Sequence, residues 1–184
     1  EIRPSEIWYQ EREDFSEKGL GVSTPSFPNQ GFELLKGNAQ FSGPILGGCL
    51  ESMYDCFDSS LYADSVQLTQ KYKLFPTLED WSGKILLLET SEERPSVELY
   101  RKMIQALKQY GIFEVVSGVL VGKPQNEIHY EEYKAVLLEE LQDKELSIVY
   151  NVNVGHATPR CIVPFGVHAQ VDVDAQVIRF DYNK

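Results

Sequence analysis

A run of four apolar residues, Ile85–Leu88, constrains the fold of this chain more than any other feature. So short a continuous run, following Gly83-Lys84, is typical of a strand that is buried on both faces of a sheet. Val115–Val121 predicts a second strand of this kind, and the residues between them, Pro95–Tyr110, carry apolar side chains at helical spacing before Gly111. This strand–helix–strand order predicts an α/β domain with a mixed sheet and flanking helices.

The remaining elements are expected to be short and to alternate along the chain. Strands are predicted at Phe32–Lys36, Ala39–Phe41, Ser147–Val152, Cys161–Val163, His168–Val173 and Gln176–Phe180, and helices at Cys49–Phe57, Asp64–Lys73 and Tyr130–Leu141. Residues 1–30 are rich in Pro, Ser, Glu and Gly and lack a sustained period. We therefore expect residues 1–30 to be a lead-in linker and residues 31–184 to be one domain.

The charge balance excludes some classes of partner. The formal net charge of -11 argues against binding to the phosphate backbone of a nucleic acid, which needs a clustered basic face. The acidic residues, spread over Glu11 to Asp14, Glu92, Glu93, Glu131, Glu132, Glu139 and Glu140, are interpreted as solvated surface. No apolar run approaches the roughly 20 residues that span a bilayer, so no membrane partner is expected.

The three cysteines are an odd number without the spacing of a zinc site. We interpret Cys49, Cys56 and Cys161 as free thiols and expect a cytoplasmic protein. His129 with Glu132, and His156 with His168, form no ligand set, so no metal is expected. The chain has no phosphate-binding Gly motif, and no cofactor is expected.

Two residues stand where α/β proteins place functional groups. Glu89 closes the apolar strand, although an acid at that position also caps helices. His156 lies in a loop after a buried strand, where Gly155 allows a sharp turn, but a loop histidine is often only structural. An acid and a histidine are two members of a nucleophilic triad. The third is missing, because no Gly-x-Ser-x-Gly motif is present and Ser42, Ser117 and Cys161 are interpreted as structural.

Three segments follow one another along the chain: Gly43-Pro44-Ile45-Leu46-Gly47-Gly48-Cys49-Leu50, Gly83-Lys84-Ile85-Leu86-Leu87-Leu88-Glu89-Thr90-Ser91-Glu92-Glu93, and Val154-Gly155-His156-Ala157-Thr158-Pro159 leading to Val163-Pro164-Phe165-Gly166. Together and in this order they resemble the LD-carboxypeptidase family of serine peptidases. The resemblance is to the C-terminal domain of that family, of swivelling β/β/α type, with residues 1–30 as the interdomain linker. It implies that Glu89 orients His156, and that His156 is the general base for a serine on an N-terminal domain that this chain lacks. The chain alone is then expected to be inactive, and the full-length protein to be a homodimer.

The stretch after Glu89 is closer to the microcin C self-immunity branch than to murein tetrapeptide carboxypeptidases. That branch cleaves the amide between an aminoacyl group and a modified nucleotide, and it stacks the nucleobase on an aromatic residue. The resemblance makes Trp8 the candidate for that stacking, although Trp8 could equally be a hydrophobic anchor for the linker. The chain departs from the family pattern at Cys49, where an Asn is usual. A murein carboxypeptidase and a non-catalytic binding module remain as alternatives.

Overall fold

The computed structural model describes residues 1–12 and 14–183. It contains one seven-stranded sheet of order β3-β7-β6-β5-β4-β8-β9 and a separate pair of strands, β1 and β2. The strands are β1 Ile7–Tyr9, β2 Ser26–Pro28, β3 Glu33–Lys36, β4 Gln40–Cys49, β5 Ile85–Glu89, β6 Gly118–Gly122, β7 Ile148–Val152, β8 His168–Asp172 and β9 Val177–Asp181. The helices are α1 Leu50–Tyr54, α2 Ser65–Tyr72, α3 Leu78–Trp81, α4 Val97–Tyr110 and α5 Tyr130–Glu140, with 3₁₀ turns η1 Glu17–Gly19, η2 Ile112–Glu114 and η3 Gln125–Glu127.

The centre of the sheet is parallel and its borders are antiparallel. Strands β4, β5, β6 and β7 run parallel to one another, whereas β3, β8 and β9 join antiparallel. The four apolar residues of β5, Ile85–Leu88, are all at most 4% exposed, as the sequence predicts for a strand covered on both faces. Burial of each such side chain contributes about 1.5–3 kcal/mol. The predicted α/β class with a mixed sheet is confirmed.

Strand β4 is longer than the sequence indicates, and it joins the two parts of the sheet. Gln40–Pro44 pairs antiparallel with β8, and the following half pairs parallel with β5. Pro44, which has no N–H to donate, lies where the pairing changes. Gly47 lies within the strand with φ 145°, and a Cβ there would lie 2.0 Å from the Leu87 carbonyl oxygen. Only glycine allows this approach of two backbones.

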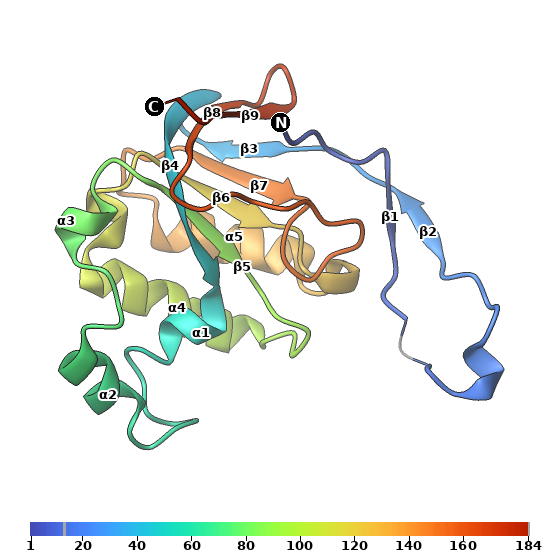
Figure 1. Cartoon of the computed structure of the whole chain (residues 1–184), viewed down its shortest axis with the longest axis horizontal. Coiled ribbons are helices and arrows are strands. Elements are labelled where there is room, and N and C mark those ends of the chain that lie inside the picture. Colours follow the sequence, from blue (N-terminus) through green and yellow to red (C-terminus); the bar gives the residue numbers. More distant parts are fainter. Residues whose placement is uncertain (13, 184) are drawn as a thin grey trace.

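Helices cover one face of the sheet. Figure 1 shows α4 and α5 side by side beneath the strands, with α1 at the end of β4. The rings of Tyr100 and Tyr133 stack between the two helices with centroids 4.0 Å apart. Helix α4 begins at Val97 rather than Pro95, because the Ser96 hydroxyl accepts the Leu99 N–H and caps the helix. It ends where the sequence predicts, at Gly111.

The opposite face is covered in part by the chain termini and by the curled edge strands. Phe32, Ile2 and residues of β8 and β9 form a second buried cluster against β4, β5 and β7. The predicted strand Cys161–Val163 is wrong, and no strand is assigned there. The Cys161 N–H donates to the Asn153 carbonyl and closes a loop, and Ile162 is 93% exposed.

The lead-in segment carries regular structure that its composition does not predict. Strands β1 and β2 form an antiparallel ribbon, in which Trp8 pairs with Phe27. In Figure 1 this ribbon, coloured blue, runs along one side of the domain and extends beyond it. We call residues 5–31 the N-terminal arm.

Candidate active site

Glu89 lies at the carboxyl end of the central strand β5. Its neighbour across the parallel pair is Cys49, the last residue of β4. The side chain of Glu89 is only 11% exposed, because the adjacent strand end at Gly122 and the loop after β7 enclose it. Burial raises the pKa of this carboxyl group, and the hydrogen bond from His156 opposes that shift.

His156 lies in the loop that leaves β7, and two glycines bring this loop against Glu89. Gly155 has φ 78°, and a Cβ there would lie 2.3 Å from Glu89 Oε2. A Cβ at Gly122 would lie 3.0 Å from both the Glu89 Cβ and the Val154 carbonyl oxygen. The close approach of the loop to the buried carboxylate therefore requires glycine at position 155 and leaves little room for a side chain at position 122.

The structure brings the two predicted site residues into direct contact. His156 Nδ1 is 2.8 Å from Glu89 Oε2. When Nδ1 carries the proton, it donates to the carboxylate, which fixes the plane of the imidazole and leaves Nε2 for chemistry. This is how an acid orients a histidine in a nucleophilic triad.

A second carboxylate, which the sequence analysis assigned to the solvated surface, also contacts the imidazole. Glu92 Oε2 is 2.9 Å from His156 Nε2, and the Glu92 side chain is 62% exposed. Because ionised carboxylates only accept, a histidine that donates to both carries a proton on each ring nitrogen. In that state His156 can act as a base at Nε2 only after the contact with Glu92 opens and Nε2 loses its proton to solvent. The sequence carries no pattern that separates Glu92 from the neighbouring surface acid Glu93.

A third acid holds the loop that carries Glu92. Glu51, in the first turn of α1, accepts hydrogen bonds from the backbone N–H and the hydroxyl of Ser91 at 2.9 and 2.7 Å. Its other oxygen lies 3.4 Å from the Cys49 thiol. Cys49 thus hydrogen-bonds within the site, and its pKa is raised, chiefly by burial.

Trp8 lies in the arm, and it is well covered. Its ring is 6% exposed, stacks on Phe27 with centroids 4.6 Å apart, and lies 5.2 Å from the Lys123 ammonium. Phe27 is the more accessible member of the pair at 40%. Lys123 directly follows β6, so Trp8 belongs to the same edge of the sheet as Glu89.

Among the described residues, the imidazole of His156 contacts only carboxylates. There, no Ser, Thr or Cys side chain hydrogen-bonds to His156, and no three His, Cys, Asp or Glu residues are grouped as metal ligands. Over the same ranges, no helix has the length and apolar character needed to cross a membrane.

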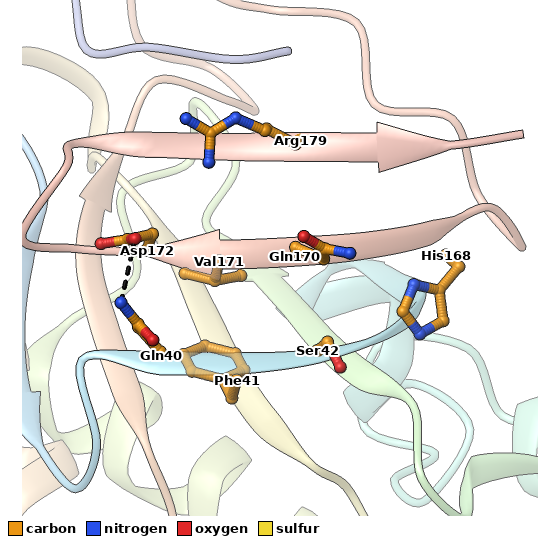
Figure 2. Close-up of a pocket in the computed structure, with 8 residues that line it drawn as sticks. All are labelled: Gln40, Phe41, Ser42, His168, Gln170, Val171, Asp172 and Arg179. Carbon is orange, nitrogen blue, oxygen red and sulfur yellow. Dashed lines mark hydrogen bonds between the residues drawn. The ribbon is translucent and has the colours of Figure 1, made fainter.

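A separate hollow lies on the outer side of β4, β8 and β9. Figure 2 shows its lining: Gln40, Phe41, Ser42, His168, Gln170, Val171, Asp172 and Arg179. Gln40 donates to Asp172 at 3.0 Å across the strands. Ser42 and Cys49 are seven residues apart on one extended strand, which separates this hollow from the Glu89 site by about 20 Å.

Comparison with known proteins agrees with this architecture. Residues 42–171 match the LD-carboxypeptidase C-terminal domain family. The chain belongs to this family. An MccF-like protein from Streptococcus pneumoniae, crystallised with AMP, is 63% identical over the whole chain, with a TM-score of 0.96. The microcin C7 self-immunity protein MccF matches 96% of the chain at 22% identity and a TM-score of 0.74, which shows the shared fold.

These relatives are longer than the chain. It covers 53% of the Streptococcus protein and 48% of MccF. A Vibrio cholerae relative with a carboxypeptidase name is 28% identical over 160 residues, which are 85% of the chain and 42% of that protein. The chain therefore spans about half the length of the proteins it matches, and it falls in a peptidase family.

Proposed function

We propose that this chain supplies the acid and the base of a serine-type amide hydrolase, and that the nucleophilic serine lies on an N-terminal domain outside it. The observation that carries the proposal is the 2.8 Å contact between His156 Nδ1 and the buried Glu89 carboxylate. The family match, to a domain described as C-terminal, supports the division of the site between two domains.

In the proposed mechanism His156 acts first as a base and then as an acid, and Glu89 holds it throughout. The serine hydroxyl attacks the scissile carbonyl carbon while His156 Nε2 takes its proton. The imidazolium, held by the Glu89 carboxylate, then gives this proton to the leaving nitrogen as the C–N bond breaks. Water repeats the sequence on the acyl-serine and releases the acid. The Glu92 contact at Nε2 must open before the serine can bind there.

We propose an aminoacyl nucleotide as the substrate. The Streptococcus relative was crystallised with AMP, and MccF with glutamyl sulfamoyl guanosine. Trp8, with the more exposed Phe27, is proposed as the aromatic surface for the nucleobase, because stacking of this kind contributes about 1–3 kcal/mol per base. The role would be protection against toxic aminoacyl-adenylate mimics.

Hydrolysis of a murein tetrapeptide is the second candidate, and the carboxypeptidase names of relatives such as the Vibrio protein favour it. A binding module without catalysis would need no contact between a buried acid and a histidine. The proposal includes a homodimer in the full-length protein and a cytoplasmic location, in keeping with the three free cysteines.

A substrate panel separates these candidates. The full-length protein is incubated with an aminoacyl sulfamoyl adenosine and with a murein tetrapeptide, and amide cleavage is followed by mass spectrometry. We expect cleavage of the aminoacyl nucleotide and no cleavage by residues 1–184 alone. Cleavage of the tetrapeptide alone would select the murein activity. Binding of either compound without cleavage would favour the binding module.

A further inference from the structure

The N-terminal arm is hydrogen-bonded to the loop that carries His156. The Tyr9 N–H donates to the Thr158 carbonyl at 2.8 Å, and the Thr158 hydroxyl donates to Glu11 Oε2 at 2.8 Å. Arg160 Nη2 reaches the same oxygen at 3.2 Å. Thr158 is two residues from His156, so these hydrogen bonds hold the chain close to the imidazole. Although Glu11 belongs to an acidic stretch expected to be solvated, its side chain is only 34% exposed.

The same residue also holds the loop after β6. The Glu11 N–H donates to Asn126 Oδ1 at 2.8 Å. Asn126 and Glu127 both have left-handed backbone, with φ of 56° and 55°. Non-glycine residues hold this conformation only where surrounding contacts fix it. Glu11 therefore connects two loops that leave adjacent strands, β6 and β7.

The far half of the His156 loop depends on this connection. Nearer its base, the loop closes on itself through the Cys161 N–H and the Asn153 carbonyl, 2.8 Å apart. Among the described residues, the hydrogen bonds that Thr158 and Arg160 make outside their own loop go to Tyr9 and Glu11.

We infer that Glu11 is a positioning residue for His156. It holds the loop where His156 Nδ1 contacts Glu89. The position of the arm therefore affects the position of the imidazole. This inference rests on the proposed function, in which the arm leads from the domain that carries the serine. Movement of that domain would then reach His156 through Glu11 and Thr158.

The first test uses residues 1–184 and needs no activity. Exchange of the His156 Nδ1 proton with water is measured by NMR in Glu11→Ala, Glu11→Gln and Glu17→Ala. Glu17 is an exposed acid in the same arm, so Glu17→Ala is a matched control for charge. We expect Glu11→Ala to accelerate the exchange about tenfold. Glu11→Gln should keep the slow wild-type rate, because its amide oxygen can still accept from Thr158, and Glu17→Ala should leave the rate unchanged.

The second test uses the full-length enzyme. Glu11→Ala is expected to lower kcat about 10-fold to 100-fold, the loss that follows from a misplacement near 1 Å, with little change in KM. Thr158→Val, which removes the hydroxyl donor, should behave in the same way if Glu11→Ala proves unstable. Exchange rates and kcat equal to those of Glu17→Ala would overturn the inference. If the wild-type enzyme cleaves no amide, the proposed function fails, while the exchange measurement still tests the positioning role.

Discussion

Replacement of Gly155 by alanine places a methyl group against the Glu89 carboxylate. Gly155 has φ 78°, and its added Cβ would lie 2.3 Å from Oε2 and 2.7 Å from the Cβ of Glu89. Gly166 provides the control, since it has the same φ of 78° and nothing within 4 Å of an added Cβ. The two substitutions therefore share the backbone strain and differ in the contact with Glu89.

The expected losses in the free energy of unfolding follow from the backbone strain and from the contact with Glu89. Left-handed backbone costs alanine about 1–2 kcal/mol, and the lower entropy of the unfolded chain returns about 0.4–1 kcal/mol. Gly166→Ala should thus lower the free energy of unfolding by about 1 kcal/mol. Gly155→Ala adds overpacking of about 1–3 kcal/mol, for a total of about 2–4 kcal/mol.

Urea unfolding of residues 1–184 measures both losses, and NMR of the His156 imidazole reports whether Nδ1 still donates to Glu89. We expect the larger loss, together with a changed Nδ1 signal, in Gly155→Ala alone. Equal losses in the two variants, with the Nδ1 signal intact in both, would refute the packing of the loop against the carboxylate.

Three further outcomes are expected. Burial raises the pKa of Glu89 in the folded state. At pH values between its unfolded and folded pKa, the folded state therefore binds more protons than the unfolded state. The stability of wild type relative to Glu89→Gln should fall as pH rises through that window, as urea titrations from pH 4 to 8 would show; a rise would contradict it. Glu92→Ala frees His156 Nε2 and should speed its acylation by diethyl pyrocarbonate about tenfold, the value of one charged hydrogen bond near 1.5 kcal/mol, whereas a rate equal to that of Glu93→Ala would refute the contact. Gly47→Ala should cost about 3 kcal/mol in urea unfolding, because its Cβ meets backbone, and Gly48→Ala, with φ 144° and open space, should cost less; equal losses would contradict this.

Local patterns were sufficient to predict the centre of the fold. The apolar run before Glu89 is a fully buried parallel strand, and helical spacing identified α4 and its end at Gly111. The course of β4 was not predictable, because a proline and three glycines normally interrupt a strand. Here the proline lies at the change of partner and Gly47 fits against Leu87, and both depend on neighbours distant in sequence.

The site was predictable only in part. Glu89 and His156 were chosen by their positions after buried strands and by family resemblance, and no spacing rule connects residues 67 apart. Glu92 and Glu11 could not be separated from the other surface acids, because composition and periodicity do not show which carboxylate meets a loop folded back over it. Their contacts arise from the turn at Gly155 and from the ribbon formed by β1 and β2.

The central claim, that Glu89 and His156 are the acid and base of an amide hydrolase, is tested most directly by kcat/KM of the full-length protein on an aminoacyl sulfamoyl adenosine. Wild type is compared with Glu89→Ala, His156→Ala and Glu93→Ala, the last removing an exposed acid from the same loop. We expect Glu93→Ala to retain activity, and His156→Ala and Glu89→Ala to lose about 10³-fold or more. Full activity in either the Glu89 or the His156 variant would contradict the account.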